Sequence, residues 1–467
     1  MRVSVSCRAV MLCVTLATLG LGAACTGGGA PGADGGDAND AGPRVDGGNP
    51  GGDAGHPGSD GGFRADGGTD GGSGGTTDGG SGAPDGGCLA GPLLQSVNKD
   101  HLLIGASMEN TTAGQAPFDL RYLYLAGGLF DGASPCASCA SGCSAGGQSC
   151  AGGACGWWGC WQWDQLPPGQ YASDFINRTK GNAQIPMFTY YELLHASGVQ
   201  EGAPEVTAAN DVNLMRRYFA DWRFLLRKIG TQTAFLHLEP DFWGYAQHVN
   251  SNPHLIPAAV ASANPTDCSG FANTIAGMGR CLVSMVRTYA PNAKVGLHAS
   301  AWGSKIDVYL NRDPAFDVAA EARKVATFLK ECGAADGDFV VVETSDRDAG
   351  YYTSIGQNRW WDATNATLPN FRQALAWAKA LAESVGKPLL WWQMPVGNMN
   401  LPNVSGQWRD NRLDYFFDHL DEVAGTHSAG VAFGAGAGGQ TTPESDNGHL
   451  LSRVRATAAA GGQPVCR

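Results

Sequence analysis

The chain has 467 residues, with 43 acidic and 31 basic side chains and a formal net charge of −12 at pH 7. Residues 26–87 carry much of this excess, with ten Asp against two Arg, so residues 88–467 are only mildly acidic. Binding to phosphate backbones requires a basic surface, and nucleic acid is therefore not expected as a partner.

Residues 1–24 have the pattern of a signal peptide. Arg2 and Arg8 form a basic start, and residues 9–24 are apolar or small, a run too short for a spanning helix. The sequence Leu-Gly-Ala-Ala-Cys that ends at Cys25 resembles the cleavage box of bacterial lipoproteins, although Leu lies one place further from Cys than usual. The resemblance implies lipidation of Cys25 and export to the cell envelope, on the outer surface or in the periplasm. The alternative is ordinary cleavage after Ala24 without a lipid.

Residues 25–87 are of low complexity, and 26 of the 62 residues after Cys25 are Gly. Almost no large apolar side chain is present to offset the entropy cost of ordering, so we expect a disordered, lipid-anchored linker. Calcium-binding repeats need a large apolar residue in each turn, which the Asp-Gly-Gly triplets here lack.

From residue 88 onward, short apolar runs alternate with amphipathic stretches. Near-continuous apolar runs are typical of strands buried on both faces, and they lie at 102–106, 122–126, 186–191, 234–239, 294–299, 339–343, 388–394 and 429–433. Helical spacing predicts helices at 211–229, 270–290, 316–331, 369–385, 411–424 and 446–459. The alternation predicts an α/β fold, a (β/α)8 TIM-like barrel over residues 88–467. The alternative is a doubly wound open sheet, but no Gly-x-Gly-x-x-Gly follows an early strand, and no cofactor is expected.

A Cys-rich insert at about 134–162 interrupts the early part of the barrel. In an exported chain, its cysteines predict three disulfides of open connectivity, formed by Cys136, Cys139, Cys143, Cys150, Cys155 and Cys160. The alternative is a zinc site, because the first three have the spacing Cys-x2-Cys-x3-Cys. Cys268 and Cys281 are expected to pair, Cys88 and Cys466 to tie the ends of the domain, and Cys332 to remain a buried thiol.

In such barrels, function collects at the C-terminal ends of the strands. The fourth run ends in His237, Glu239 and Asp241, which strand alternation places on one face. Two adjacent carboxylates do not both ionise easily, so one pKa is expected to rise, which keeps a general acid protonated near neutral pH. We expect Glu239 to be the catalytic acid. The structural alternative for this pair is a rim salt bridge or a cap for the following helix.

The sixth run ends in Glu343, a charge that closes a five-residue apolar strand. Glu343 and Asp241 are the candidates for the base or nucleophile, while Asp346 has Arg347 as an alternative partner. Aromatic faces that stack on sugar rings and polar tips that bind hydroxyls indicate a glycan cleft. The predicted substrate contacts are Glu109, Tyr190, Glu192, Trp243, His298, Trp302, Asp346, Trp392 and Gln393.

This arrangement resembles the (β/α)8 glycoside hydrolases, many of which carry an acid/base Glu at the end of the fourth strand, the position of Glu239. The resemblance is architectural and covers about residues 101–460. No Asn precedes Glu239, and the seventh run ends in Gln393 and Met394, where many retaining families have a nucleophilic Glu. The second carboxylate must then come from Asp241, Glu343 or Asp346.

The leading hypothesis is a cell-surface, polysaccharide-active glycoside hydrolase, monomeric and attached to the membrane only through its lipid. The alternative is a glycan-binding barrel without catalysis, which the missing seventh-strand acid favours. A third hypothesis is a metal-dependent hydrolase, because His298 lies one strand from His237, Glu239 and Asp241. No His-x-His or His-Glu-x-x-His motif is present, so no metal is predicted.

Overall fold

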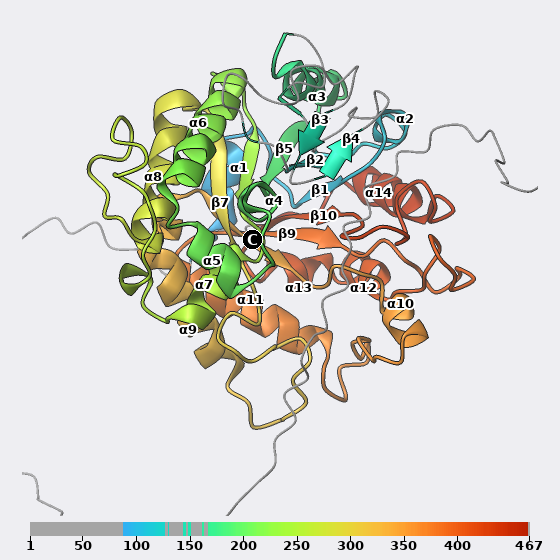
Figure 1. Ribbon diagram of the computed structural model, residues 1–467. Helices are drawn as coiled ribbons and strands as arrows, with labels where there is room; N and C mark the ends of the chain where they lie inside the picture. The colour runs from blue at the N-terminus through green and yellow to red at the C-terminus, as the bar shows by residue number, and fades with distance from the viewer. Residues whose placement is uncertain are drawn as a thin grey trace, which may run out of the picture. The chain divides into compact units, whose positions relative to one another are not determined.

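Eight parallel strands close into a barrel in the computed structural model, which describes residues 87–126, 129, 143–145, 148–150, 161–162 and 167–465 (Figure 1). Around the barrel the strands follow the order β1-β10-β9-β8-β7-β6-β5-β2. Their bounds are β1 Leu103–Ala106, β2 Leu120–Leu125, β5 Ile185–Tyr190, β6 Phe235–Leu238, β7 Lys294–Ala299, β8 Phe339–Glu343, β9 Leu389–Met394 and β10 Ser428–Phe433. These are the eight runs predicted from the sequence, and the predicted (β/α)8 barrel is confirmed.

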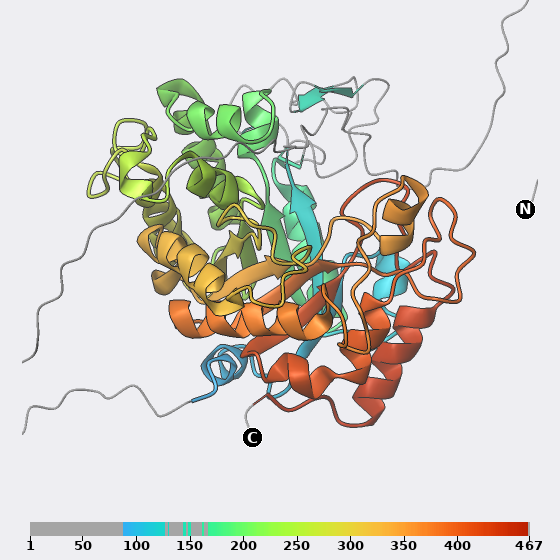
Figure 2. The ribbon, with the colours of Figure 1, turned by 90° about the horizontal axis from the view of Figure 1, so that it is seen from below.

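Helices surround the barrel and cover one of its ends (Figures 1 and 2). They are α1 Ala90–Gln95, α2 Asn110–Ala113, α3 Gln170–Gly181, α4 Leu193–Ser197, α5 Ala203–Ala208, α6 Val212–Ile229, α7 Phe242–Val249, α8 Ile275–Tyr289, α9 Val318–Glu331, α10 Ala349–Ser354, α11 Phe371–Val385, α12 Arg412–Asp418, α13 Leu420–Ala424 and α14 His449–Ala459. In the part of the chain that the structure describes, single 3₁₀ turns lie in connections at η2 Pro253–Leu255 and η3 Ala334–Asp336. The helix predicted at 411–424 is two helices, because the chain leaves helical geometry at His419 (φ −131°, ψ 39°).

Polar side chains begin the long helices. Asp211, Thr274, Asp317 and Asn370 each accept a hydrogen bond from a backbone N–H in the first turn of α6, α8, α9 and α11, respectively. Each bond satisfies one of the donors that the start of a helix leaves unpaired. These caps are encoded locally, and they fix where the chain turns from each loop into the outer layer.

Two apolar cores result from strand residues that face opposite sides of the barrel wall. One core lies between strands and helices, and the other fills the barrel interior with side chains such as Tyr122, Phe235, Phe339 and Trp392. Gly296 in β7 makes room inside, because a Cβ there would lie 2.5 Å from the Phe339 ring. Helix α1 packs against the interior core through Ala90, Leu93 and Leu94. It therefore closes one end of the barrel, and the C-terminal ends of the strands remain for function.

The disulfide predicted between Cys268 and Cys281 is present, with a Cα–Cα distance of 5.5 Å. Cys332 is a buried free thiol, as expected. Cys88 is disulfide-bonded, whereas residue 466 lies outside the described residues. In the region of the insert, β3 Cys143–Ala145 pairs with β4 Gln148–Cys150 as an antiparallel ladder. The disulfides predicted there involve side chains outside the described part.

The signal peptide, Cys25 and the linker all lie before residue 87, outside the described part of the chain. Their roles remain predictions. Among the helices that the structure describes, none has both the length and the apolar character required to span a membrane.

Candidate active site

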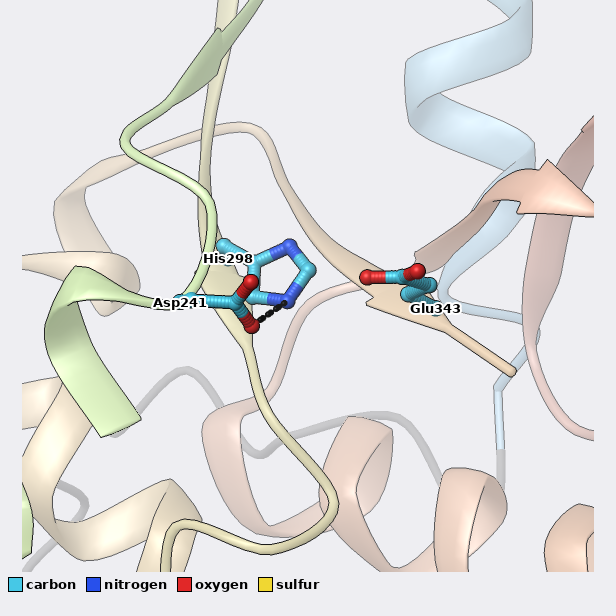
Figure 3. Close-up of side chains that lie close together, drawn as sticks. All are labelled: Asp241, His298 and Glu343. Atoms are coloured by element: carbon cyan, nitrogen blue, oxygen red, sulfur yellow. Dashed lines mark ion pairs between the residues drawn. The ribbon is translucent and has the colours of Figure 1, made fainter. Parts of the chain in front are cut away.

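Three neighbouring strands bring Asp241, His298 and Glu343 together at the mouth of the barrel. Asp241 follows β6, His298 lies near the end of β7, and Glu343 is the last residue of β8. One oxygen or nitrogen atom of each side chain lies within 4.8 Å of those of the other two. Figure 3 shows the two carboxyl groups on either side of the His298 ring. All three residues were candidates from the sequence, and the barrel brings them into one cluster.

The backbone at the strand ends has an unusual conformation. Glu239, Asp241 and Gln393 have φ values of 45°, 63° and 55°, in a backbone region that residues other than Gly rarely adopt. Such strain persists only where surrounding structure enforces it, and it clusters at functional sites. The positive φ values at Glu239 and Asp241 also interrupt the alternation of side chains along the strand. The expectation that His237, Glu239 and Asp241 share one face is therefore wrong.

Asp241 faces the cluster from the start of α7. It occupies the N-cap position but makes no capping hydrogen bond, so the structural alternative of a helix cap does not apply. Its Oδ1 lies 3.5 Å from the Ser300 hydroxyl, a donor, and 3.8 Å from Nε2 of His298. The side chain is 29% exposed, so a substrate can reach it.

Glu343 is half-buried and has a different environment. Its Oε1 accepts a hydrogen bond of 2.8 Å from Nε2 of Gln393. Burial raises the pKa of Glu343 well above its ordinary value, and the nearby charges of Asp241 and Asp346 raise it further. Asp346 itself pairs with Arg347 and accepts a hydrogen bond from Tyr352, as the alternative interpretation of this residue expected. Glu343 therefore holds its proton more strongly than an exposed glutamate does.

Two buried histidines and an indole form the floor of the site. Nε2 of His237 lies 3.1 Å from Nδ1 of His298, and both rings pack edge-on against Trp392. Tyr124 also packs against Trp392, with ring centroids 5.5 Å apart. The floor is thus aromatic and closely packed, which limits the positions that the two carboxyl groups above it can adopt.

Glu239 lies outside the cluster, although it is two residues from Asp241. Its side chain is fully buried, and its Oε1 accepts hydrogen bonds from the Tyr218 hydroxyl at 2.7 Å and from the backbone N–H of Glu192 and Leu193 at 3.3 Å. Burial raises its pKa to about 8, against the opposing effect of these donors. A raised pKa was predicted for this residue from partial desolvation and a second carboxylate, and burial alone causes the rise. Its catalytic role remains a prediction, and Asp241 and Glu343 are better placed to contact a substrate.

Glu239 belongs to a buried acidic cluster, which we define as Glu192, Asp221 and Glu239. Trp161 donates to Glu192 at 2.9 Å, and the hydroxyl of Tyr190 donates to Asp221 at 2.8 Å. Burial raises the pKa of Glu192, and the charges of Asp221 and Glu239 add to the effect. Glu192 in this cluster and Tyr190, which donates to Asp221 of the cluster, were predicted to contact substrate but have no exposed surface.

The remaining predicted substrate contacts are Trp243, Glu109 and Trp302, which differ in how much of each side chain is exposed. Trp243 is 1% exposed and donates to the Leu238 carbonyl in the outer core, and Glu109 is exposed at the start of α2. Trp302 is half-buried and packs against Tyr245 and His248, with ring-centroid distances of 4.6 and 5.1 Å. Of the predicted tryptophans, Trp302 is the one with surface for a sugar ring.

Several residues of the site lacked a signal in the sequence. Tyr122, Tyr124 and Thr189 occupy strand interiors, where the sequence predicts only core positions. The buried Tyr122 hydroxyl has no hydrogen-bond partner among the described residues, and burial together with the charge of Glu343 raises its pKa. Side chains with polar atoms at every second position of the predicted strands would have indicated these residues, since alternate positions of a barrel strand face the interior.

The donors at the mouth are of types that bind divalent metals. Two ligands held about 2 Å from a tetrahedral zinc lie about 3.3 Å apart. The distance from Nε2 of His298 to Oδ1 of Asp241 is longer, at 3.8 Å. One ligand atom from each of Asp241, His298 and Glu343 lies within 4.8 Å of the others, so small movements of these side chains would let the three hold a metal ion.

Comparison with known proteins gives a distant structural likeness and no family. No family model matches the chain, and no curated protein matches it. Similar solved structures include a modular endo-β-1,4-mannanase from Cellulomonas fimi, with 10% identity, a TM-score of 0.41, and coverage of 80% of this chain and 73% of that one. An endo-1,4-β-D-mannanase from Thermotoga petrophila has 11% identity, a TM-score of 0.40, and coverage of 77% and 99%.

The endoglucanase Cel6 from Mycobacterium tuberculosis has 12% identity and a TM-score of 0.26, over 48% of this chain. This chain spans 56% of the length of that enzyme. Likenesses at this level do not identify an activity.

Proposed function

We propose that this protein is a glycoside hydrolase that cleaves polysaccharide at the cell surface, with Asp241 and Glu343 as its reacting carboxyl groups. The observation that carries the proposal is their placement: two carboxyl groups face each other at the open end of the barrel, in unequal environments. Environments that separate two pKa values separate an acid from its partner. Export, lipid anchoring through Cys25 and a monomeric state belong to the same proposal and rest on the sequence.

The spacing of the pair supports retention of configuration. Retaining enzymes hold their carboxyl groups about 5–5.5 Å apart, whereas inverting enzymes leave about 6.5–9.5 Å for a water molecule. Here the nearest oxygens of Asp241 and Glu343 lie within 4.8 Å. Asp241 attacks the anomeric carbon while the proton of Glu343 passes to the leaving glycosidic oxygen. Glu343 then removes a proton from water, which displaces Asp241 from the glycosyl–enzyme ester and restores both groups.

The experiment is a screen of the purified chain against bacterial and plant polysaccharides, followed by analysis of the product anomer. We expect cleavage with retention by wild type, and loss of cleavage by Asp241→Asn. An inverted product would refute the assignment of Asp241 as nucleophile. Activity that disappears on chelation and returns with zinc would instead establish the metal-dependent hydrolase.

A non-catalytic glycan-binding barrel is the second candidate, and Gln393 favours it. This residue lies at the end of the seventh strand of the barrel, where many retaining families have a nucleophilic Glu, and its amide donates a hydrogen bond to Glu343. Binding of a glycan without cleavage, unchanged by Glu343→Gln, would establish this function in place of the hydrolase.

A further inference from the structure

Three polar side chains form a buried row that ends at Asp241. Thr189 in β5 and His237 in β6 lie side by side on adjacent paired strands, and Oγ1 of Thr189 lies 3.2 Å from Nδ1 of His237. Nε2 of His237 lies 3.1 Å from Nδ1 of His298, whose Nε2 lies 3.8 Å from Asp241. All three are at most 1% exposed, so bulk water does not compete for these contacts.

Both imidazole rings are neutral in this setting. Burial lowers the pKa of His298 to about 3, and burial together with the neighbouring ring lowers the pKa of His237 well below its ordinary value. A neutral imidazole has one N–H donor and one acceptor nitrogen. Each ring in the row must therefore accept on one side and donate on the other.

This requirement couples the direction of every hydrogen bond in the row. If His298 donates from Nε2 to Asp241, its Nδ1 must accept from Nε2 of His237, and Nδ1 of His237 must accept from the Thr189 hydroxyl. If Asp241 instead carries a proton and donates it, all three bonds reverse. The row therefore has two consistent arrangements, and only the first points a donor at an ionised Asp241.

We propose that Thr189, His237 and His298 form a one-way hydrogen-bond chain that orients Asp241 and keeps it as the ionised carboxylate of the reacting pair. This inference rests on the proposed function for the role of Asp241, but the arrangement of protons does not depend on catalysis. Thr189 and His237 are positioning residues, since they act through His298 and do not reach the mouth. The 3.8 Å gap above His298 closes when substrate covers the site, because catalytic hydrogen bonds often tighten only in the substrate complex.

The first test reads the tautomers directly. In the ¹⁵N-histidine-labelled full chain at neutral pH, long-range ¹H–¹⁵N spectra distinguish protonated from unprotonated ring nitrogens. We expect both His237 and His298 to carry the proton on Nε2, with assignment from the signals lost in His237→Gln and His298→Gln. A proton on Nδ1 of either ring, or a doubly protonated ring, would overturn the proposal. The spectrum needs no substrate, so this outcome is independent of whether any glycan is cleaved.

The second test uses two substitutions of Thr189, the residue of the hydrogen-bond row that lies farthest from Asp241. Thr189→Val keeps the shape but removes the hydroxyl, whereas Thr189→Ser keeps the hydroxyl. One hydrogen bond corresponds to a roughly three- to tenfold effect, so we expect Thr189→Val to lower kcat by about that factor with KM unchanged. Thr189→Ser should retain the wild-type kcat, and the tautomers of both rings should persist in it. Equal kcat values for the Val and Ser variants would contradict the role of the hydroxyl.

Discussion

The barrel contains two groups of carboxyl side chains that differ in what surrounds them. At the mouth, Asp241 and Glu343 are partly exposed and face each other across His298. In the buried acidic cluster, Glu192, Asp221 and Glu239 have no exposed surface and are bonded by Trp161, Tyr190 and Tyr218. Both settings raise pKa values, so a raised pKa does not by itself identify a catalytic group. Access for substrate separates the two groups.

The same amide substitution in both regions gives the largest expected contrast. Glu343→Gln removes the proton donor at the mouth, and we expect kcat on a natural glycan to fall about 10²–10⁴-fold. Glu239→Gln changes a side chain that substrate does not reach, so we expect a much smaller loss. Turnover of both variants is measured on the glycan that the screen identifies. Loss of all activity in Glu239→Gln with an intact fold would restore Glu239 as the acid.

The buried acidic cluster should make stability depend on pH. In the unfolded chain Glu239 loses its proton near pH 4.5, whereas in the folded chain it keeps it up to about pH 8. Between these values the folded state holds the additional proton, so stability falls as pH rises. We expect wild type to lose on the order of a few kcal/mol relative to Glu239→Gln between pH 5 and pH 8.

Denaturant unfolding at the two pH values measures this loss. The matched control is Glu109→Gln, since this side chain is exposed and makes no capping hydrogen bond at the start of α2. Parallel pH dependence in wild type and Glu239→Gln would show that Glu239 ionises in the folded chain as it does in water.

Tyr218→Phe sharpens the same comparison with a smaller effect. Its hydroxyl donates to Glu239 and opposes the rise of that pKa. Removing the donor leaves a buried carboxyl oxygen with one partner fewer, at a cost of about 1–3 kcal/mol. We expect the destabilisation to be greater at pH 8 than at pH 5, because the bond strengthens when Glu239 is ionised. Equal destabilisation at both pH values would contradict this coupling.

Trp302 should contribute least, and to substrate binding rather than to turnover. Stacking of a sugar ring on an indole face is worth about 1 kcal/mol, so Trp302→Ala should raise KM about fivefold with kcat nearly unchanged. Trp360→Ala is the control at another half-buried tryptophan, one bonded to Thr353. An equal change in KM for both variants would indicate a general effect of losing surface aromatic residues.

The sequence by itself determined the barrel, because buried parallel strands and capped helices are local patterns. Eight apolar runs predicted the eight strands of the barrel, and Cys268 was expected to pair with Cys281 because the two flank a short segment. Asp241, His298 and Glu343 were found because strand ends meet at one edge of any such barrel.

Only the tertiary structure decided which carboxyl groups reach the mouth. Alternation assigned Glu239 and Asp241 to one face, but positive φ at both residues turns one toward α6 and the other toward His298. Those angles are enforced by packing around the strand end and have no local signature. The row from Thr189 through His237 is likewise set by the register between β5, β6 and β7, which places polar atoms far apart in the chain within bonding distance.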